Sequence, residues 1–146
     1  MFRMTIECVP SWENMDHLDQ MTEHLLSRLD TVHTRKLCFA IHELIINAME
    51  ATYRAYGKAA DCSSIALTIR LEHEDIIVKV TNTGQYNSLE AIRRNQDRHF
   101  EEMLSEESGR GLLLARHLSD ELRVEQNEFG IVSIEFRKKG GCINEP

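Results

Sequence analysis

Two runs of alternating apolar and polar residues, joined by a short polar segment, constrain the fold of this chain more than any other feature. Apolar side chains occupy every second position over residues 65–71 and again over 76–80, with polar residues 72–75 between them. Alternation with a period of two is typical of a strand with one buried and one solvent-facing side. A short polar connection joins antiparallel neighbours. The pattern predicts a β-hairpin, with a loop over residues 72–75, in an antiparallel sheet.

Apolar residues at helical spacing predict two helices before this hairpin, over residues 12–30 and 32–56. Ser11 suits the N-cap of the first helix, and Gly57 suits the C-cap of the second. The other predicted elements are a strand at residues 2–9, a helix that opens at 108–111, and strands around 122–124 and 132–136. The strands cluster as hairpins, and the helices are too few for a doubly wound parallel sheet. The predicted fold class is therefore α+β, a two-layer sandwich whose antiparallel or mixed sheet has helices on one face.

The length of 146 residues suits one domain, so a single domain is predicted over residues 1–146. Residues 84–108 carry many charges and weak periodicity. A stretch of that length between elements of a compact domain is typical of a lid, or it holds a short helix. Residues 139–146 are predicted to form a frayed tail.

The net charge of −7, from 17 basic and 24 acidic side chains, argues against two classes of partner. Nucleic-acid backbones and anionic membrane surfaces are bound mainly by clustered cations, so neither is expected as a direct partner. The chain contains no apolar run long enough to span a membrane, and its N-terminus lacks the pattern of a signal peptide. A cytoplasmic location is predicted.

The cysteines and histidines form no recognisable metal or redox motif. No two of the 4 cysteines are spaced as C-x-x-C, so they are interpreted as reduced, partly buried thiols. His42 and Glu43 begin like the zinc-protease motif H-E-x-x-H, but Ile46 stands in place of the second histidine. Neither a nucleophile elbow nor a P-loop is present.

Three short segments carry candidate chemistry, and the first lies on the second predicted helix. Glu43 and Asn47 are four residues apart, so they lie on one helix face, one turn from each other. An amide oxygen is a suitable ligand for Mg²⁺. A carboxylate beside the metal can hold or deprotonate a nucleophile. By spacing alone, a solvated pair at the boundary of an amphipathic helix is the more common explanation.

The other two segments place glycines at a strand end and at a helix start. Asn82 and Gly84 follow a predicted strand, where they form a turn or hold a side chain that reads a ligand's hydrogen-bonding edge. Gly109 and Gly111 flank Arg110 just before a predicted helix. Glycines let backbone amides approach an anion, and the helix N-terminus and Arg110 add positive charge. An ordinary turn that starts a helix is an equally common reading of this pair.

Together and in this order, the three segments resemble the GHKL ATPase superfamily, which includes gyrase-type, chaperone, histidine-kinase and mismatch-repair ATPases. Within it, the run from Gly109 to Leu122 is most similar to the bacterial anti-sigma-factor serine kinases. The resemblance covers about residues 2–138. It implies the Bergerat, or histidine kinase-like ATPase, fold and the cofactors ATP and Mg²⁺.

The resemblance also implies a role for each site residue. Glu43 matches the acidic residue that acts as general base or positions a water, and Asn47 matches the Mg²⁺ ligand. Asn82 stands at the position of the aspartate that reads adenine. The remaining implied nucleotide contacts are Gly84 and, at the phosphates beside the lid, Gly109, Arg110 and Gly111. Catalysis would consist of positioning and charge neutralisation, as phosphoryl transfer requires.

The chain departs from the family pattern at the adenine end. Asn82 replaces the aspartate, Tyr86 replaces the second glycine of that motif, and Ala51 replaces a histidine that is often found in the family. A neutral amide accepts a hydrogen bond more weakly than a carboxylate, and it can also present its NH₂ group. The loss of a charge-assisted bond corresponds to about 1–3 kcal/mol. The phosphate and metal ends match the family.

The predicted function is an ATP-binding regulatory protein of the anti-sigma factor or serine-protein kinase type. Such a protein binds MgATP and phosphorylates a serine of an antagonist protein, or it sequesters a sigma factor, and family members are commonly homodimers. The alternative is a non-catalytic GHKL domain that acts only through protein–protein contacts. A detached ATPase domain of a histidine kinase is a third reading, which the run from Gly109 to Leu122 disfavours.

Overall fold

The computed structural model describes residues 1–28, 34–57, 63–83, 110–127 and 131–139. Its elements are, in chain order, β1 (Phe2–Cys8), α1 (Trp12–Ser27), α2 (Thr34–Tyr56), β2 (Ile65–Glu72), β3 (Asp75–Thr83), α5 (Arg110–Leu118), β4 (Glu121–Gln126) and β5 (Ile131–Lys138). This order of strands and helices is the predicted one, with element ends shifted by a few residues.

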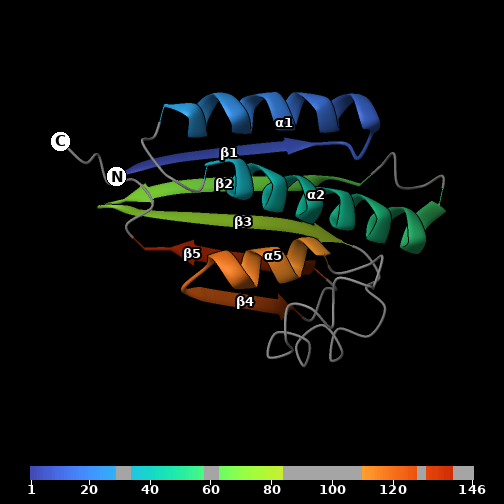
Figure 1. Ribbon diagram of the computed structural model, residues 1–146. Coiled ribbons are helices and arrows are strands. Elements are labelled where there is room, and N and C mark those ends of the chain that lie inside the picture. Colours follow the sequence, from blue (N-terminus) through green and yellow to red (C-terminus); the bar gives the residue numbers. More distant parts are fainter. Residues whose placement is uncertain (29–33, 58–62, 84–109, 128–130, 140–146) are drawn as a thin grey trace.

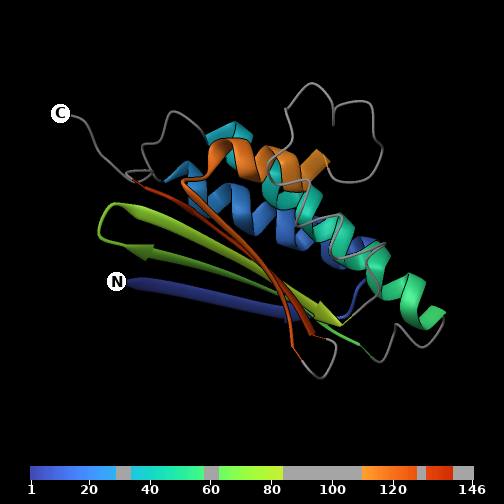
Figure 2. The same cartoon turned by 90° about the horizontal axis from the view of Figure 1, so that it is seen from below.

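The five strands form one sheet in the order β1-β2-β3-β5-β4 (Figure 1). All four pairings are antiparallel, so the sheet is antiparallel rather than mixed. Figure 2 shows α1, α2 and α5 together on one face of the sheet. The predicted α+β two-layer sandwich is confirmed.

The β2–β3 hairpin is tighter than the sequence predicts. Glu72 and Asp75 pair with each other, so the loop contains only His73 and Glu74 instead of four residues. His73 has a φ of 56°. Two-residue hairpin loops use such positive φ angles because their twist then matches that of the strands. The four-residue loop was therefore wrong, since strand pairing extends to the last residue on each side.

Local capping sets the ends of the first two helices. The Ser11 side chain accepts a hydrogen bond from the Asn14 backbone N–H at 3.1 Å, which confirms the predicted N-cap of α1. Gly57 has a φ of 54°, a left-handed conformation that suits a glycine after a helix. Helix α1 ends at Ser27, three residues before its predicted end, with Arg28 as its C-cap.

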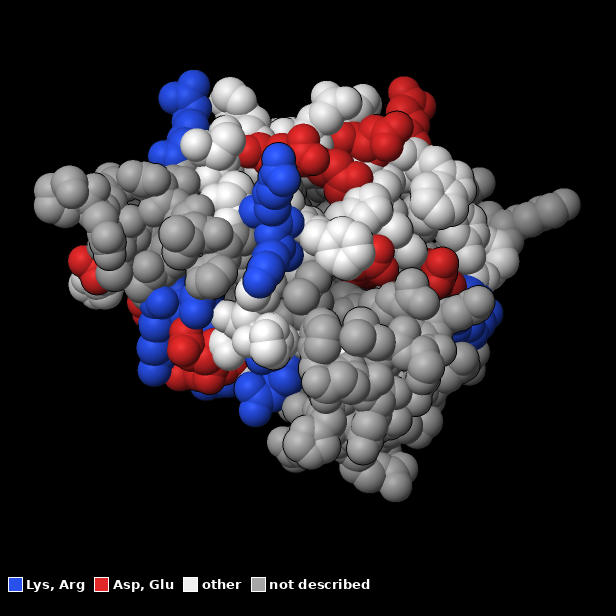
Figure 3. All heavy atoms as spheres, viewed as in Figure 1, with Lys and Arg blue, Asp and Glu red and all other residues white. Residues whose placement is uncertain are grey.

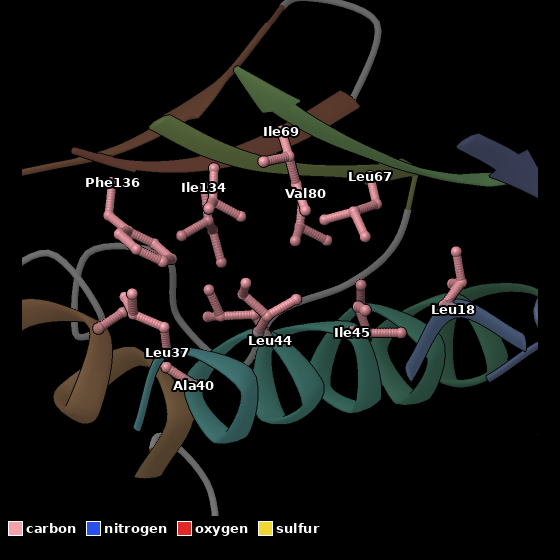
Figure 4. Packing of buried hydrophobic residues seen from close by; sticks show 14 of the residues in the cluster. Leu18, Leu37, Ala40, Leu44, Ile45, Leu67, Ile69, Val80, Ile134 and Phe136 are labelled. Atoms are coloured by element: carbon pink, nitrogen blue, oxygen red, sulfur yellow. The ribbon is translucent and has the colours of Figure 1, made fainter. Parts of the chain in front are cut away.

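The hydrophobic core fills the space between the three helices and one face of the sheet. Figure 4 shows side chains from α2 pointing at side chains from the strands opposite. The residues labelled there are Leu18, Leu37, Ala40, Leu44, Ile45, Leu67, Ile69, Val80, Ile134 and Phe136. Because α2 lies against both β3 and α5, its buried stripe forms the centre of this core.

The opposite face of the sheet carries ion pairs between arginines and carboxylates. Ile77 is 1% exposed there and lies directly between Arg70 and Arg137 in the strand register. Arg137 contacts Asp75 at 2.9 Å, and Arg70 contacts Glu135 at 3.1 Å. The aliphatic stems of the two arginines shield Ile77 while their charged ends stay paired at the surface.

Some predictions lie wholly or mostly outside the described residues. These are the lid at residues 84–108 and the tail at 139–146, of which only Lys139 is described. The single domain over residues 1–146 stays a prediction. Among the described helices, none combines the length and apolar character needed to cross a membrane.

Candidate functional site

Helix α2 positions Glu43 and Asn47 at the border between its buried and exposed sides. Both residues are half-buried, whereas Leu44 and Ala48 beside them are fully buried. The buried neighbours hold the helix face in place, and the two polar side chains lie one turn apart at its edge. The structure therefore leaves both groups reachable by a ligand.

Asn82 comes from the penultimate residue of β3 and points toward α2. It lies on the same side of the strand as Val78 and Val80, which face the helices, and it is 2% exposed. Its Nδ2 atom lies 3.4 Å from Thr52 Oγ1 on α2. The Thr52 hydroxyl in turn donates to the backbone oxygen of Ala48 at 2.8 Å. A short polar chain thus links the end of β3 to α2 beside the buried apolar side chains.

Arg110 and Gly111 form the first turn of α5, which lies against α2. Figures 1 and 2 place the start of α5, the end of β3 and the later part of α2 at the same end of the molecule. The predicted site residues Gly84 and Gly109 lie outside the described residues, as does Tyr86. The three elements that carry the candidate motifs therefore converge.

Sequence reasoning did not assign Thr52 to the site. Two signals could have found it. Thr52 follows Ala48 by four residues, so it lies on the buried stripe of α2. Asn82 is two residues from Val80 along the strand, so its side chain is expected on the same inward face of the sheet. Two polar residues directed into one core are expected to meet, because buried polar groups need partners.

His42 has a structural position that the sequence pattern did not indicate. Its Nδ1 atom lies 2.7 Å from Asp19 Oδ2, so it joins α2 to α1. Within the parts of the chain that the structure describes, no three His, Cys, Asp or Glu side chains gather as a metal site. An Mg²⁺ ion at this site would depend on the Asn47 amide oxygen together with nucleotide phosphates, a donor set that suits a hard cation.

A shallow groove of about 600 Å³ runs between α1 and α2, away from the site described above. Its walls include Asp19, Glu23, Arg35 and the exposed ring of Phe39. Cys38 also lines it, and burial, followed by the charges of Glu23 and Asp19, raises the pKa of the Cys38 thiol. On its α1 side the groove is lined by Asp19, Thr22, Glu23 and Ser27, two of which are carboxylates.

Comparison with known proteins agrees with this arrangement. The family model for the histidine kinase-like ATPase domain matches residues 11–136, which is most of the chain. A search of curated proteins finds no match. The matched region contains α2, the end of β3 and α5, and ATP is the nucleotide that this family implies. The chain belongs to the histidine kinase-like ATPase domain family.

Proposed function

We propose that the chain is an ATP-binding regulatory protein of the anti-sigma factor or serine-protein kinase type. It binds MgATP and phosphorylates a serine of an antagonist protein, or it sequesters a sigma factor. The observation that carries this proposal is the convergence of α2, the end of β3 and the start of α5 at one end of a histidine kinase-like ATPase domain. The run from Gly109 to Leu122, which resembles the serine kinases, supports the finer assignment.

In this proposal the chain's own residues position the reacting groups and neutralise the charge of the phosphates, and they form no covalent bond to the nucleotide. Asn47 holds the metal through its amide oxygen, and Glu43 accepts the proton of the attacking hydroxyl or orients a water. The start of α5 directs backbone N–H groups and its partial positive charge toward the phosphates. The bound MgATP supplies the phosphoryl group and the cation that offsets its charge.

Calorimetric titration of the chain with ATP and Mg²⁺ tests the binding step. The wild type is expected to bind, and Asn47→Ala is expected to lose the Mg²⁺-dependent part of the affinity. Gln20→Ala removes an exposed amide on α1 and serves as the matched control. A folded wild type that binds neither ATP nor ADP at millimolar concentration contradicts the proposal.

A second variant separates binding from catalysis. Glu43→Gln keeps the size of the side chain and removes its basicity, so ATP binding is expected to persist. Transfer of phosphate to an antagonist serine is expected to slow by about 10²- to 10⁴-fold, which is the usual contribution of a general base. Transfer at the wild-type rate would remove Glu43 from the proposed mechanism.

The charge of α1 supports a protein partner with a basic surface. The helix carries four carboxylates, at Glu13, Asp16, Asp19 and Glu23, and no Lys or Arg. Trp12 is 67% exposed and Met21 46% exposed on the same helix. Figure 3 shows acidic side chains gathered along the edge of the molecule that α1 forms. Acidic and exposed apolar groups together suit a basic amphipathic segment.

The test of this surface uses a sigma factor or antagonist protein encoded beside this chain. Asp16→Asn combined with Glu23→Gln is expected to weaken the complex and to reduce its salt dependence. Glu74→Gln, in the hairpin loop, is an exposed acidic control and is expected to leave binding unchanged. Sedimentation of the isolated chain checks whether it forms the homodimer that the resemblance implies.

The alternative function, a non-catalytic domain that acts only by protein contact, has one observation in its favour. Asn82 replaces the family's carboxylate, while the exposed face of α1 is available to a partner. The two proposals differ in one outcome. Partner binding that is unaffected by ATP, in a chain that binds no nucleotide, supports the alternative.

A further inference from the structure

Two of the three buried polar residues among those described lie against each other. The three are Thr22, Thr52 and Asn82, and the last two are 0% and 2% exposed. Thr52 Oγ1 and Asn82 Nδ2 are 3.4 Å apart. At this length the contact contributes less energy than a typical hydrogen bond. Its consequence lies in the direction that it gives to the Asn82 amide.

The hydroxyl of Thr52 can act on Asn82 only as an acceptor. A hydroxyl has one proton and two lone pairs, and the Thr52 proton is donated to the Ala48 backbone oxygen at 2.8 Å. The amide atom that faces Thr52 is therefore the donor, Nδ2. The reversed amide would bring two lone-pair-bearing oxygens together in a site closed to water, which is unfavourable.

We propose that Thr52 is a positioning residue that turns the Asn82 amide so that its carbonyl oxygen, Oδ1, accepts a hydrogen bond from the amino group of adenine. This inference rests on the proposed nucleotide binding at this end of the molecule. Adenine carries an amino donor at the position where guanine carries a carbonyl acceptor. An amide held with Oδ1 toward the base therefore selects adenine, although it lacks the charge of a carboxylate.

The orientation itself is tested without nucleotide. In the free protein, the two Asn82 side-chain amide protons are expected to exchange slowly with water and to show nuclear Overhauser contacts to the Thr52 side chain. In Thr52→Val the hydroxyl is replaced by a methyl group of similar size, and the exchange protection is expected to fall. Unprotected Asn82 amide protons in the wild type contradict the inference.

The consequence is tested by competition between ATP and GTP for the folded chain with Mg²⁺. The wild type is expected to prefer ATP, and Thr52→Val is expected to reduce the ratio of the two affinities by about tenfold, the value of one hydrogen bond. Thr52→Ser retains the hydroxyl and is expected to restore the ratio. Thr22→Val removes another buried helical hydroxyl, on α1, and is expected to leave the ratio unchanged.

The outcomes separate this inference from the proposed function. A wild type that binds neither nucleotide overturns the proposed function. A wild type that binds GTP as well as ATP, or a Thr52→Val variant with an unchanged ratio, overturns the role of Thr52 and leaves nucleotide binding intact. An equal loss of affinity for both nucleotides in Thr52→Val points to a merely structural residue and also refutes the inference.

Discussion

The substitution Asn82→Asp introduces the carboxylate that the family resemblance implies at this position, and the structure predicts a cost in stability. Asn82 is 2% exposed, and the proton of its neighbour Thr52 is directed at Ala48. A carboxylate here lies beside a hydroxyl whose proton is directed at another acceptor. The introduced charge is therefore buried before any ligand arrives.

The magnitude follows from two opposing terms. A buried charge without its partner destabilises by about 3–5 kcal/mol. Rotation of the Thr52 hydroxyl toward the carboxylate adds a hydrogen bond to a charged group, which offsets about 1.5–3 kcal/mol. The net decrease in the free energy of unfolding is then about 2 kcal/mol at neutral pH, which is a large fraction of the stability of a small domain.

The loss of stability caused by Asn82→Asp depends on pH. Burial of the carboxyl group determines whether this loss grows or shrinks as the pH rises. Burial raises the pKa of the introduced carboxyl above that of the unfolded chain, about 3.9. Below about pH 4 the carboxyl group is neutral in both the folded and the unfolded state. No charge is then buried, and the stability deficit of the variant relative to the wild type is smallest. As the pH rises, the deficit relative to the wild type grows by about 1.4 kcal/mol per unit until it levels off. For a deficit of about 2 kcal/mol, the plateau is reached near pH 5.5 to 6.

Urea unfolding of the wild type and the variant between about pH 4 and pH 8 measures this difference. Asn47→Asp introduces the same charge at a half-buried position on α2 and is expected to show a much smaller pH-dependent deficit. An Asn82→Asp variant as stable as the wild type at pH 7, or one whose deficit grows toward low pH, refutes the reasoning. Saturating MgATP is expected to recover part of the deficit, because the adenine amino group then donates to the carboxylate.

Three further predictions concern the core and the α1–α2 groove. Thr22 Oγ1 is a buried atom without a hydrogen-bond partner in the described structure, so Thr22→Val is expected to raise the free energy of unfolding by about 1 kcal/mol in urea titration; destabilisation would show that the hydroxyl has a partner. Leu44 is 0% exposed and faces the sheet, so Leu44→Ala is expected to lower the free energy of unfolding by about 3 kcal/mol. Met21 is half-exposed, so Met21→Ala is expected to lower it by at most about 0.5 kcal/mol. Equal losses would contradict the described packing. Burial and nearby carboxylates raise the pKa of Cys38, so alkylation of its thiol is expected to be slow at neutral pH and faster as the pH rises. The Glu23→Gln variant is expected to react faster than the wild type at each pH. An identical rate in both proteins would show that Glu23 does not contribute to the raised pKa.

Local patterns predicted most of the fold. The alternating runs in β2 and β3, the stripe along α2 and the Ser11 cap each depend on residues close together in the chain. The hairpin loop was predicted too long because the pairing of Glu72 with Asp75 adds strand residues that carry no apolar signal. Strand pairing at polar residues is decided by the neighbouring strands rather than by alternation.

The candidate site was predicted only in part, for a similar reason. The helical spacing of Glu43 and Asn47 follows from the sequence alone. The meeting of Thr52 with Asn82 depends on which turn of α2 lies over the end of β3, and that is set by packing across 30 residues of sequence. The direction of an amide group also depends on where a hydroxyl proton points, which no spacing rule contains.

The strand order has a consequence for how the chain assembles. The β2–β3 and β4–β5 pairs are hairpins that close locally. In contrast, β1 pairs with β2 and β3 pairs with β5 across long stretches of the chain, from Cys8 to Ile65 and from Thr83 to Ile131. Long-range pairing of this kind carries the entropy of closing a long loop, so it is expected to limit the folding rate. The pairing of β3 with β5 joins the half of the chain that contains Asn47 and Asn82 to the half that contains α5. A nucleotide that touches both halves would hold the β3–β5 pairing in place, and its site would be complete only after that pairing has formed.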